Sequence, residues 1–478
     1  MIKIAVLMVA ATAAFSGSAV ASDPAVPAIT FSKVWTHNHS DIAGQVSETL
    51  AFDRKTNTLW VAGVVGVDVL DAATGGLVEH IDITAYGAIN SVAIHNGLAA
   101  FAVEAAPDRR NPGMVLFYDT RTRLPSGSVN AVPVGPLPDM LTFTHDGLKL
   151  LVANEGTPNA VADRPYVSPD PVGSVSIIDV ESRTVIATPV LAGVPVGGDN
   201  TRTNTGMDFE PEYIAVDEDD KTAYVTLQEG NAIAVLDLSR HEFTRVIGLG
   251  AKDFSQPGNQ FDPLDTVPPV VSFISANVKG LYMPDGIAAY EWDGKTYLVT
   301  ANEGDFREDN VDRVAASTFG AVAPLNRLRV SGADSSAGNL FAAGARSFSI
   351  RNEVGELIYD SGDLLDKKAA ALGLYDDGRS RDKGVEPEGV ALLDIAGRTY
   401  AFIGLERTIK GAVAVFDITR PTDVAFVDMI VTDGDVSPEG LAAYHYRGDF
   451  FLAIANEVSR TTTLYKIEKA RRNSGQDD

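Results

Sequence analysis

The stretch that decides the fold is residues 283–305, Met-Pro-Asp-Gly-Ile-Ala-Ala-Tyr-Glu-Trp-Asp-Gly-Lys-Thr-Tyr-Leu-Val-Thr-Ala-Asn-Glu-Gly-Asp. Two short apolar runs, 286–290 and 296–301, flank an Asp-Gly pair, which is a strong signal for a hairpin turn. An antiparallel hairpin returns to where it began. We therefore expect Asp285, at the start of the first strand, and Glu303, at the end of the second, to lie close together on one rim.

The same unit recurs four more times along the chain. Each copy opens with Pro followed by Asp or Glu, and a second acid follows the first after 16 to 18 residues. The five pairs are Asp139 and Glu155, Glu212 and Glu229, Asp285 and Glu303, Glu388 and Glu406, and Glu439 and Glu457. Two weaker copies precede them, one with Glu48 and no second acid, the other ending at Glu104. A repeat at constant spacing predicts a repeated structural unit.

A third β-rich segment follows each hairpin. The seven copies are residues 67–71, 114–119, 174–179, 232–237, 347–350, 412–417 and 462–467. Seven three-strand units that open toward one rim are typical of the radial repetition of small sheets. We predict an all-β protein, a seven-bladed β-propeller. An N-terminal strand in residues 29–39 should pair outside 461–467 on the last blade and close the ring, which leaves no exposed edge.

The two ends of the chain have their own signatures. Residues 1–21 contain Lys3, an apolar stretch and Ala19-Val20-Ala21, the features of a secretory signal with its cleavage site. Residues 22–468 should then form a single propeller domain, and 469–478 a polar tail. No later run is long and apolar enough to span a bilayer. The chain has no cysteine, so its stability must come from packed sheets. We expect an exported monomer, periplasmic or secreted.

The charge of the chain limits its partners. It has 64 acidic and 39 basic residues and a formal net charge of −25. So acidic a protein is a poor candidate for binding nucleic acids or anionic membranes. Acids outside the repeats are best explained as a solvated surface.

The ten acids of the five pairs are the candidate metal ligands, and Glu48 and Glu104 are further candidates. If the hairpins are inner strands, these carboxylates ring one mouth of the central channel, where they repel one another unless cations neutralise them. Ca²⁺ is the natural counter-ion, with Mg²⁺ or another divalent metal as the alternative. Asn154, Asn302 and Asn456, each directly before an acid, would add carbonyl ligands. Alternatively, each acid caps its own turn by accepting backbone N–H bonds.

His37-Asn38-His39 is a second candidate metal site. Histidines two residues apart on a strand share a face and offer ligands to one ion. The alternative, surface histidines beside a turn, is the one we favour because short motifs often arise by chance.

Six stretches of the chain resemble the choice-of-anchor I family, also called the mesenchyme-specific cell surface glycoprotein-like domain. They are residues 276–288, 300–305, 345–350, 382–390, 404–407 and 455–459. The resemblance covers nearly the whole mature chain and implies an exported β-propeller. Family members often carry a C-terminal anchor, whereas the polar tail of this chain carries none. Some relatives are described as atypical alkaline phosphatases or phytase-like esterases.

This resemblance implies a metal-dependent phosphoesterase, in which a metal cluster on the rim binds phosphate oxygens and activates a water. The candidate catalytic residues are Arg407, Glu303 and Asp285. Arg307, Lys279 and Lys383 are further cations near the acidic openings, and each has an alternative role as the ion-pair partner of a neighbouring carboxylate.

The second hypothesis is a non-catalytic, calcium-stabilised module that presents its rim loops to a partner. The expected partner is accordingly a small phosphorylated substrate or a polymer of the cell envelope or extracellular space.

Overall fold

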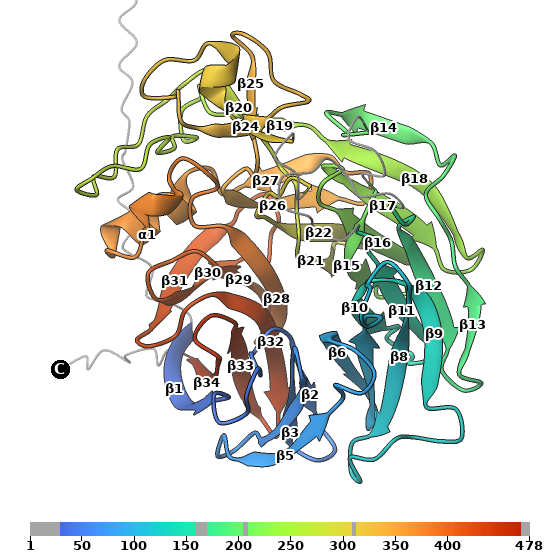
Figure 1. The fold of residues 1–478 in the computed structure, drawn as a ribbon. Helices are drawn as coiled ribbons and strands as arrows, with labels where there is room; N and C mark the ends of the chain where they lie inside the picture. The colour runs from blue at the N-terminus through green and yellow to red at the C-terminus, as the bar shows by residue number, and fades with distance from the viewer. Residues whose placement is uncertain (1–28, 158–169, 204–208, 308–311, 470–478) are drawn as a thin grey trace, which may run out of the picture.

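The computed structural model describes residues 29–157, 170–203, 209–307 and 312–469, and in this part the chain is mainly β-strand (Figure 1). Seven sheets, six of four strands and one of five, stand around a common centre, and two smaller sheets lie outside them. The predicted signal at 1–21 and the tail beyond 469 lie outside the described residues. Within the described part, no helix has the length and apolar character to cross a membrane. The chain is therefore an all-β protein with the radial arrangement of a β-propeller.

The sheets follow one another along the chain. The first is β2 (Leu50–Asp53), β3 (Thr58–Gly63), β4 (Gly66–Asp71) and β5 (Leu77–Asp82); the second is β6 (Ile89–His95), β7 (Leu98–Val103), β8 (Pro112–Asp119) and β9 (Ala131–Pro136). The third is β10 (Pro138–Phe143), β11 (Lys149–Asn154), β12 (Ser174–Asp179) and β13 (Thr184–Ala187). The fourth is β15 (Pro211–Val216), β16 (Thr222–Leu227), β17 (Ala232–Asp237) and β18 (Glu242–Leu249), with β14 (Val196–Asp199) added on β18.

The remaining three sheets follow in the same way. The fifth is β21 (Ile287–Trp292), β22 (Lys295–Asn302), β26 (Ser347–Asn352) and β27 (Leu357–Asp360); the sixth is β28 (Pro387–Ile395), β29 (Arg398–Leu405), β30 (Gly411–Asp417) and β31 (Ala425–Thr432). The last is β32 (Pro438–Tyr446), β33 (Asp449–Asn456), β34 (Thr461–Lys469) and β1 (Ile29–Asn38), and β1 pairs antiparallel with β34. The first strand of each sheet contacts the first strand of the next, and β32 contacts β2.

The sequence units are shorter than the sheets. We expected three strands in each unit, and the structure adds a fourth, outer strand. Sequence patterning did not single out this strand in six of the sheets because much of it faces water, as in β13, which has no buried residue. The predicted hairpin at 283–305 is present: β21 and β22 pair antiparallel, and the turn residues Asp293 and Gly294 have φ angles of 52° and 69°.

The first acid of each pair sits at an irregular strand start. The residue before the proline has a positive φ in four of the five units, at Leu137, Met283, Glu386 and Ser437. The register then shifts just after the proline in four hairpins, for example between Pro138 and Leu141. A bulge at the start of a strand redirects a side chain. The Pro-acid motif thus aims the carboxylate out of the sheet toward the axis.

Glycines after three of these acids allow neighbouring sheets to approach closely. A Cβ on Gly286, Gly389 or Gly440 would collide with the backbone carbonyl of the acid in the next sheet, which is Glu439 for Gly389. The glycine therefore sets the width of the channel mouth.

Gly389→Ala should destabilise the protein by about 1–3 kcal/mol because the methyl group must push two backbones apart. The free energy of unfolding in urea measures this loss. Gly197→Ala is the matched control, since a Cβ there meets nothing within 4 Å. Equal stability of the two variants would contradict the tight contact between sheets.

A subdomain interrupts the fifth sheet on its outer side (Figure 1). It contains a sheet of β19 (Ala251–Asp253), β20 (Val278–Leu281) and β25 (Leu340–Ala342), the pair β23 (Arg313–Ala315) and β24 (Arg329–Ser331), and the helical segments η1 (Ala316–Phe319), α1 (Leu364–Ala371) and η2 (Asp377–Arg379). It has a small core of its own around Phe254, Phe261 and Leu328. Its short strands and helical segments lie within residues 251–281, 313–342 and 364–379.

Candidate metal centre at the channel mouth

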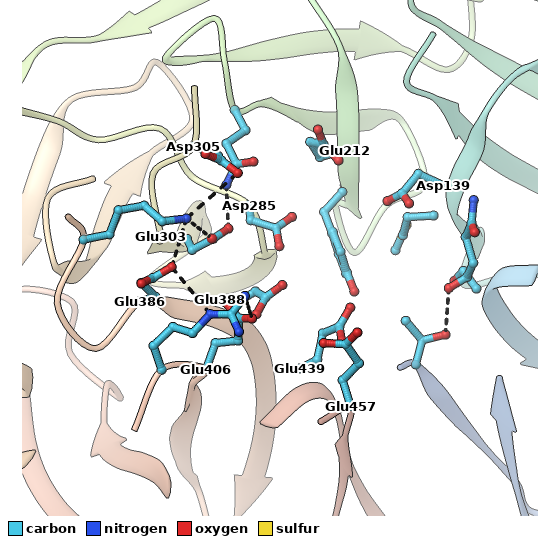
Figure 2. A pocket seen from close by; sticks show the side chains of 18 of the residues that line it. Asp139, Glu212, Asp285, Glu303, Asp305, Glu386, Glu388, Glu406, Glu439 and Glu457 are labelled. Atoms are coloured by element: carbon cyan, nitrogen blue, oxygen red, sulfur yellow. Dashed lines mark hydrogen bonds and ion pairs between the residues drawn. The ribbon is translucent and has the colours of Figure 1, made fainter. Parts of the chain in front are cut away.

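An open cavity of about 490 Å³ lies where the first strands begin (Figure 2). Eight of the ten predicted acids line it: Asp139, Glu212, Asp285, Glu303, Glu388, Glu406, Glu439 and Glu457. Two acids that the sequence did not single out, Asp305 and Glu386, join them. The lining bases are Arg313, Arg379, Lys383 and Arg407. Ten carboxylates against four bases leave a formal excess of six negative charges in one cavity.

Five carboxylates, the first acids of their pairs, form an inner ring. They are Asp139, Glu212, Asp285, Glu388 and Glu439. Each comes from a different sheet, and among the described residues none has a hydrogen bond or ion pair on its carboxylate. The Oε2 atom of Glu388 is buried without a hydrogen-bond partner. The five inner-ring carboxylates therefore have no direct cationic partner among the described residues.

The second acids that line the cavity, Glu303, Glu406 and Glu457, form an outer ring, whose charge the protein compensates in part. The buried Lys383 places its Nζ 2.5 Å from Glu303 and 3.0 Å from Glu386. The other oxygen of Glu303 accepts a 2.8 Å bond from Gln228. Arg407 lies 2.6 Å from Glu406. Protein cations therefore already occupy part of this side of the mouth.

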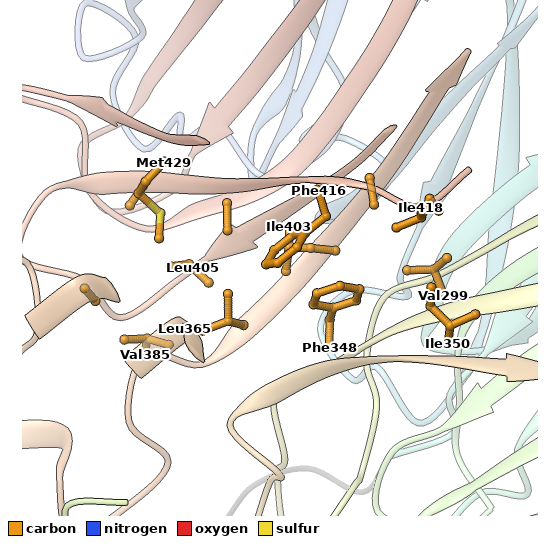
Figure 3. Close-up of a cluster of buried hydrophobic side chains, with 14 of the residues drawn as sticks. Val299, Phe348, Ile350, Leu365, Val385, Ile403, Leu405, Phe416, Ile418 and Met429 are labelled. Carbon is orange, nitrogen blue, oxygen red and sulfur yellow. The ribbon is translucent and has the colours of Figure 1, made fainter. Parts of the chain in front are cut away.

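Apolar packing holds Lys383 in position. Leu365 on α1 and Val385, two residues after the lysine, are fully buried in a cluster with Phe348, Ile403 and Phe416 from the fifth and sixth sheets (Figure 3). Packing of this kind fixes the connecting segment against the blades. The ammonium group is consequently a fixed part of the mouth.

Burial and mutual repulsion change the acidity of the ring. Burial, together with neighbouring carboxylates, raises the pKa of Glu212, Asp285, Glu388 and Glu439 well above their ordinary values. Burial raises the pKa of Asp139 to about 6 although Arg109 opposes the shift. For Glu406, burial and Glu303 raise the pKa to about 8. Burial and Glu457 do the same for Glu48, whose pKa is also about 8. Without cations, the folded mouth holds protons that the unfolded chain releases near pH 4.

These shifts predict that the metal-free protein loses stability as pH rises. A carboxyl group with a raised folded-state pKa binds more protons folded than unfolded, so stability falls from about pH 4 until the groups near 8 are ionised. In EDTA, the melting temperature at pH 8.5 should be lower than at pH 5. Millimolar Ca²⁺ should raise it mainly at pH 8.5. If Ca²⁺ raised the melting temperature equally at both pH values, the inference that the metal-free mouth holds protons would be wrong.

The donor geometry suits a hard cation. Asp285, Glu303 and Glu388 each offer one oxygen, and these three atoms lie within 4.8 Å of one another. Glu303, Glu386 and Glu406 form a second such group, but Lys383 already pairs with Glu303 and Glu386, and Arg407 pairs with Glu406. All donors are oxygens, which Ca²⁺ and Mg²⁺ prefer. The residues therefore fit a divalent ion on the Asp285 side of the mouth.

Two predicted ligands lie elsewhere. Glu155 and Glu229 do not line the cavity; they lie near Glu210, whose pKa burial and Glu229 raise well above its ordinary value. The buried Arg307 lies 3.3 Å from Glu210 and 2.6 Å from Asp170. Arg307 is therefore the ion-pair partner of a separate acidic group and not a cation of the mouth.

Several other predicted contacts need correction. Asn154 and Asn302 are fully buried, and their amide oxygens accept bonds from Gly135 N–H and the Thr300 hydroxyl, so they face the sheets. Asn456 is also buried and donates to the Ile454 and Thr461 carbonyls. The reason is strand alternation: each asparagine directly precedes an acid and points to the opposite side. Lys279 does not line the cavity; its Nζ lies 5.2 Å from the centre of the Phe341 ring.

His39 is buried rather than exposed, which corrects the favoured reading of this pair. Its Nδ1 is 2.5 Å from Asp68 and its Nε2 is 2.8 Å from the Thr462 hydroxyl. Asp68 also bonds His80 at 2.6 Å; burial raises the pKa of Asp68, but the interactions with His39 and His80 outweigh burial and leave this pKa lowered. His37, His39 and Asp68 are close enough for one ion. Both His39 nitrogens already have protein partners, however, so the cluster ties β1 and β34 to the first sheet.

The site also contains residues that sequence reasoning missed. Asp305, Glu386, Arg313 and Arg379 belong to the inserted subdomain or its edges, where no repeat marks them. The one available signal was at Glu386, which directly precedes the Pro-acid motif of the sixth sheet. Tyr213 follows Glu212 and lines the cavity among the inner-ring acids.

Comparison with solved structures places the architecture among known folds. The chain is similar to Kuenenia stuttgartiensis hydrazine synthase, with TM-score 0.53, 13% identity, and coverage of 91% of this chain and 97% of that one. It is also similar to a chain of the mitotic checkpoint complex, with TM-score 0.52, 11% identity, and coverage of 96% and 99%. At sequence identities this low, the similarity shows a shared fold and nothing about function.

No curated protein matches the chain. The family comparison is more specific, because residues 48–421 match the choice-of-anchor I domain. That segment contains six of the seven first strands and four of the five inner-ring acids. The chain belongs to the choice-of-anchor I family.

Proposed function

We propose that the channel mouth binds divalent cations, with Ca²⁺ preferred and Mg²⁺ or another divalent metal as the alternative. The observation that carries this proposal is the inner ring: five carboxylates from five sheets share one cavity and have no partner among the described residues. A hard cation relieves their repulsion and uses their oxygens as ligands. Asp285, Glu303 and Glu388 would hold the first ion, and Asp139, Glu212 and Glu439 would offer further oxygens.

The proposal includes the finer architecture. We infer that the seven sheets are the blades of one propeller domain in residues 22–468, closed by β1 on β34. The continuous contacts between first strands support this reading. We also infer that residues 1–21 direct export to the periplasm or beyond and that the mature protein is a monomer. Membership of the choice-of-anchor I family supports export.

We further propose that the loaded mouth hydrolyses phosphate esters. Bound divalent ions would neutralise phosphate oxygens and lower the pKa of a water. Arg407 would bind and orient the phosphoryl group, because its side chain is 40% exposed, lines the cavity and holds Glu406 through one nitrogen. Asp285 and Glu303 would keep the ion beside it.

A specific observation favours the alternative, a non-catalytic binding module. Each of the four lining bases already pairs with a carboxylate: Arg313 with Asp305, Arg379 with Glu386, Lys383 with Glu303, and Arg407 with Glu406. Paired bases attract a phosphate less strongly than free ones. In that case the ions stabilise the propeller, and the rim loops bind an envelope or extracellular polymer.

One set of assays separates these functions. The protein is incubated with 4-nitrophenyl phosphate or bis(4-nitrophenyl) phosphate, with Ca²⁺ or EDTA, and its melting temperature is recorded in parallel. Turnover that requires Ca²⁺ and is lost in Glu388→Gln, but not in the exposed control Glu242→Gln, supports the esterase. A Ca²⁺-dependent rise in melting temperature without turnover supports the binding module. No Ca²⁺ effect on either measurement would overturn both.

A further inference from the structure

A second cavity, of about 520 Å³, lies at the opposite ends of the first strands. Its lining comes from residues 52–55 at the end of β2, 94–96 at the end of β6, and 442–444 in β32. Glu439 of the inner ring and Tyr444 of this cavity are five residues apart on β32, which is about 17 Å along an extended strand. The two cavities share no lining residue. This cavity is therefore a separate place on the molecule.

One wall of the second cavity is aromatic. The rings of Phe52 and Tyr444 stack with centroids 3.9 Å apart and an interplanar angle of 8°. Tyr446 packs edge-on against Phe52, and Phe451 packs behind Tyr444 at 5.4 Å. Stacked rings held by further rings form a rigid surface. Because Phe52 and Tyr444 cover each other's faces, a ligand ring would pack against the edges of this pair, an edge-to-face arrangement that aromatic rings favour.

The charge of the second cavity is opposite to that of the whole chain. Its single carboxylate, Asp53, is buried and receives hydrogen bonds from the N–H of Lys55, from the N–H of Thr56 and from the Thr56 hydroxyl. Asp53 is thus engaged by its own turn. In a protein with a net charge of −25, this cavity has a local excess of basic groups.

Both basic side chains are bonded only to neutral groups. Arg54 donates to the His445 carbonyl at 2.7 Å, and Lys55 donates to the Asn96 carbonyl at 2.7 Å. In the described ranges of the chain, neither lies within ion-pair distance of a carboxylate. The two carbonyl bonds hold the cationic groups at the rim of the cavity, where their charge is available to a ligand.

We propose that this cavity binds a small organic anion that carries a flat apolar ring. The acid group of the ligand pairs with Arg54 and Lys55, and its ring lies along the wall made by Phe52 and Tyr444. An inorganic anion would leave the aromatic wall unused, and a neutral aromatic compound would leave the two cations unpaired. The ligand class is therefore an aryl carboxylate or an acid of similar shape. This proposal does not depend on the metal site.

Isothermal titration calorimetry with 2-naphthoate tests the proposal. The full-length protein is kept in EDTA at low salt so that screening is weak and the acidic mouth stays metal-free. We expect one saturable site per chain. The neutral analogue 2-naphthalenemethanol should bind about tenfold or more weakly, which corresponds to about 1.4 kcal/mol.

Two variants separate charge from shape. Arg54→Gln/Lys55→Gln should weaken 2-naphthoate about tenfold or more and leave the neutral analogue unchanged. Phe52→Leu should weaken both compounds. Lys221→Gln/Arg240→Gln is the matched control, because these exposed bases pair with Asp219 and Glu242 elsewhere on the surface. Thermal melts check that every variant is folded.

The outcomes are decisive in either direction. Equal affinity of 2-naphthoate for the wild type and the Arg54/Lys55 variant overturns the proposal, as does the absence of binding up to about 10 mM, far above a specific affinity. If the Lys221/Arg240 control lost as much affinity for 2-naphthoate as the Arg54/Lys55 variant, the loss would reflect only the net charge of the protein. That result would also overturn the proposal.

Discussion

Lys383→Met should unfold at a much lower urea concentration than the wild type in EDTA. The side chain is 5% exposed, and its ammonium lies between Glu303 and Glu386. Removing one partner of a buried ion pair leaves the other charge uncompensated and costs about 3–5 kcal/mol. Methionine keeps most of the volume, so the loss reflects charge and not a cavity.

The expected rescue by metal makes this variant informative. Without the ammonium, the group formed by Glu303, Glu386 and Glu406 loses one of its cationic partners and attracts a metal cation more strongly. Ca²⁺ should therefore restore more stability to Lys383→Met than it adds to the wild type. Lys221→Met, with an exposed ion pair, is the control and should leave unfolding unchanged. Unfolding of Lys383→Met at the wild-type urea concentration would show that the buried pair contributes nothing.

The second large effect concerns Asp285→Asn/Glu388→Gln. Wild-type protein should gain about 2.7 kcal/mol when free Ca²⁺ exceeds its Kd a hundredfold, because the ion binds only the folded state. The double variant should gain none, since two of the three grouped oxygens lose their charge. In EDTA the variant should be at least as stable as the wild type, because amides do not repel the remaining ring.

Asp219→Asn/Glu242→Gln removes two exposed acids from outside the mouth and should keep the full Ca²⁺ effect. Denaturant unfolding at several free Ca²⁺ concentrations measures each gain. A Ca²⁺ effect that survives in the Asp285/Glu388 variant would place the ion away from the inner ring.

The repeated Pro-acid motif made the inner ring predictable from sequence. Proline fixes where each first strand starts, and the constant spacing of the second acid fixes the hairpin length, so Asp139 and Glu439 could be placed on one rim without coordinates. The outer ring was less predictable. Glu155 and Glu303 have the same place in the repeat, yet the first lies outside the cavity and the second contacts Lys383, which lies 80 residues away in sequence.

Other features had no local signal. Lys383, Arg379 and Glu386 reach the mouth because a subdomain folds back on the fifth and sixth sheets. That packing depends on long-range contacts, such as those that bury Val385 in one cluster with Phe348 and Ile403. The error on the asparagines had a simple source: adjacent strand residues alternate sides, and Asn154 cannot point where Glu155 points.

The tethered ammonium of Lys383 has a lasting consequence. A metal ion dissociates when its concentration falls, whereas the ammonium of Lys383 is covalently attached and remains beside Glu303. One arc of the mouth should therefore keep its shape in calcium-poor water, while the arc around Asp139, Glu212 and Glu439 rearranges with supply. The conformation of the mouth would then depend on the Ca²⁺ concentration on one side only, while the side that contains Lys383 stays the same.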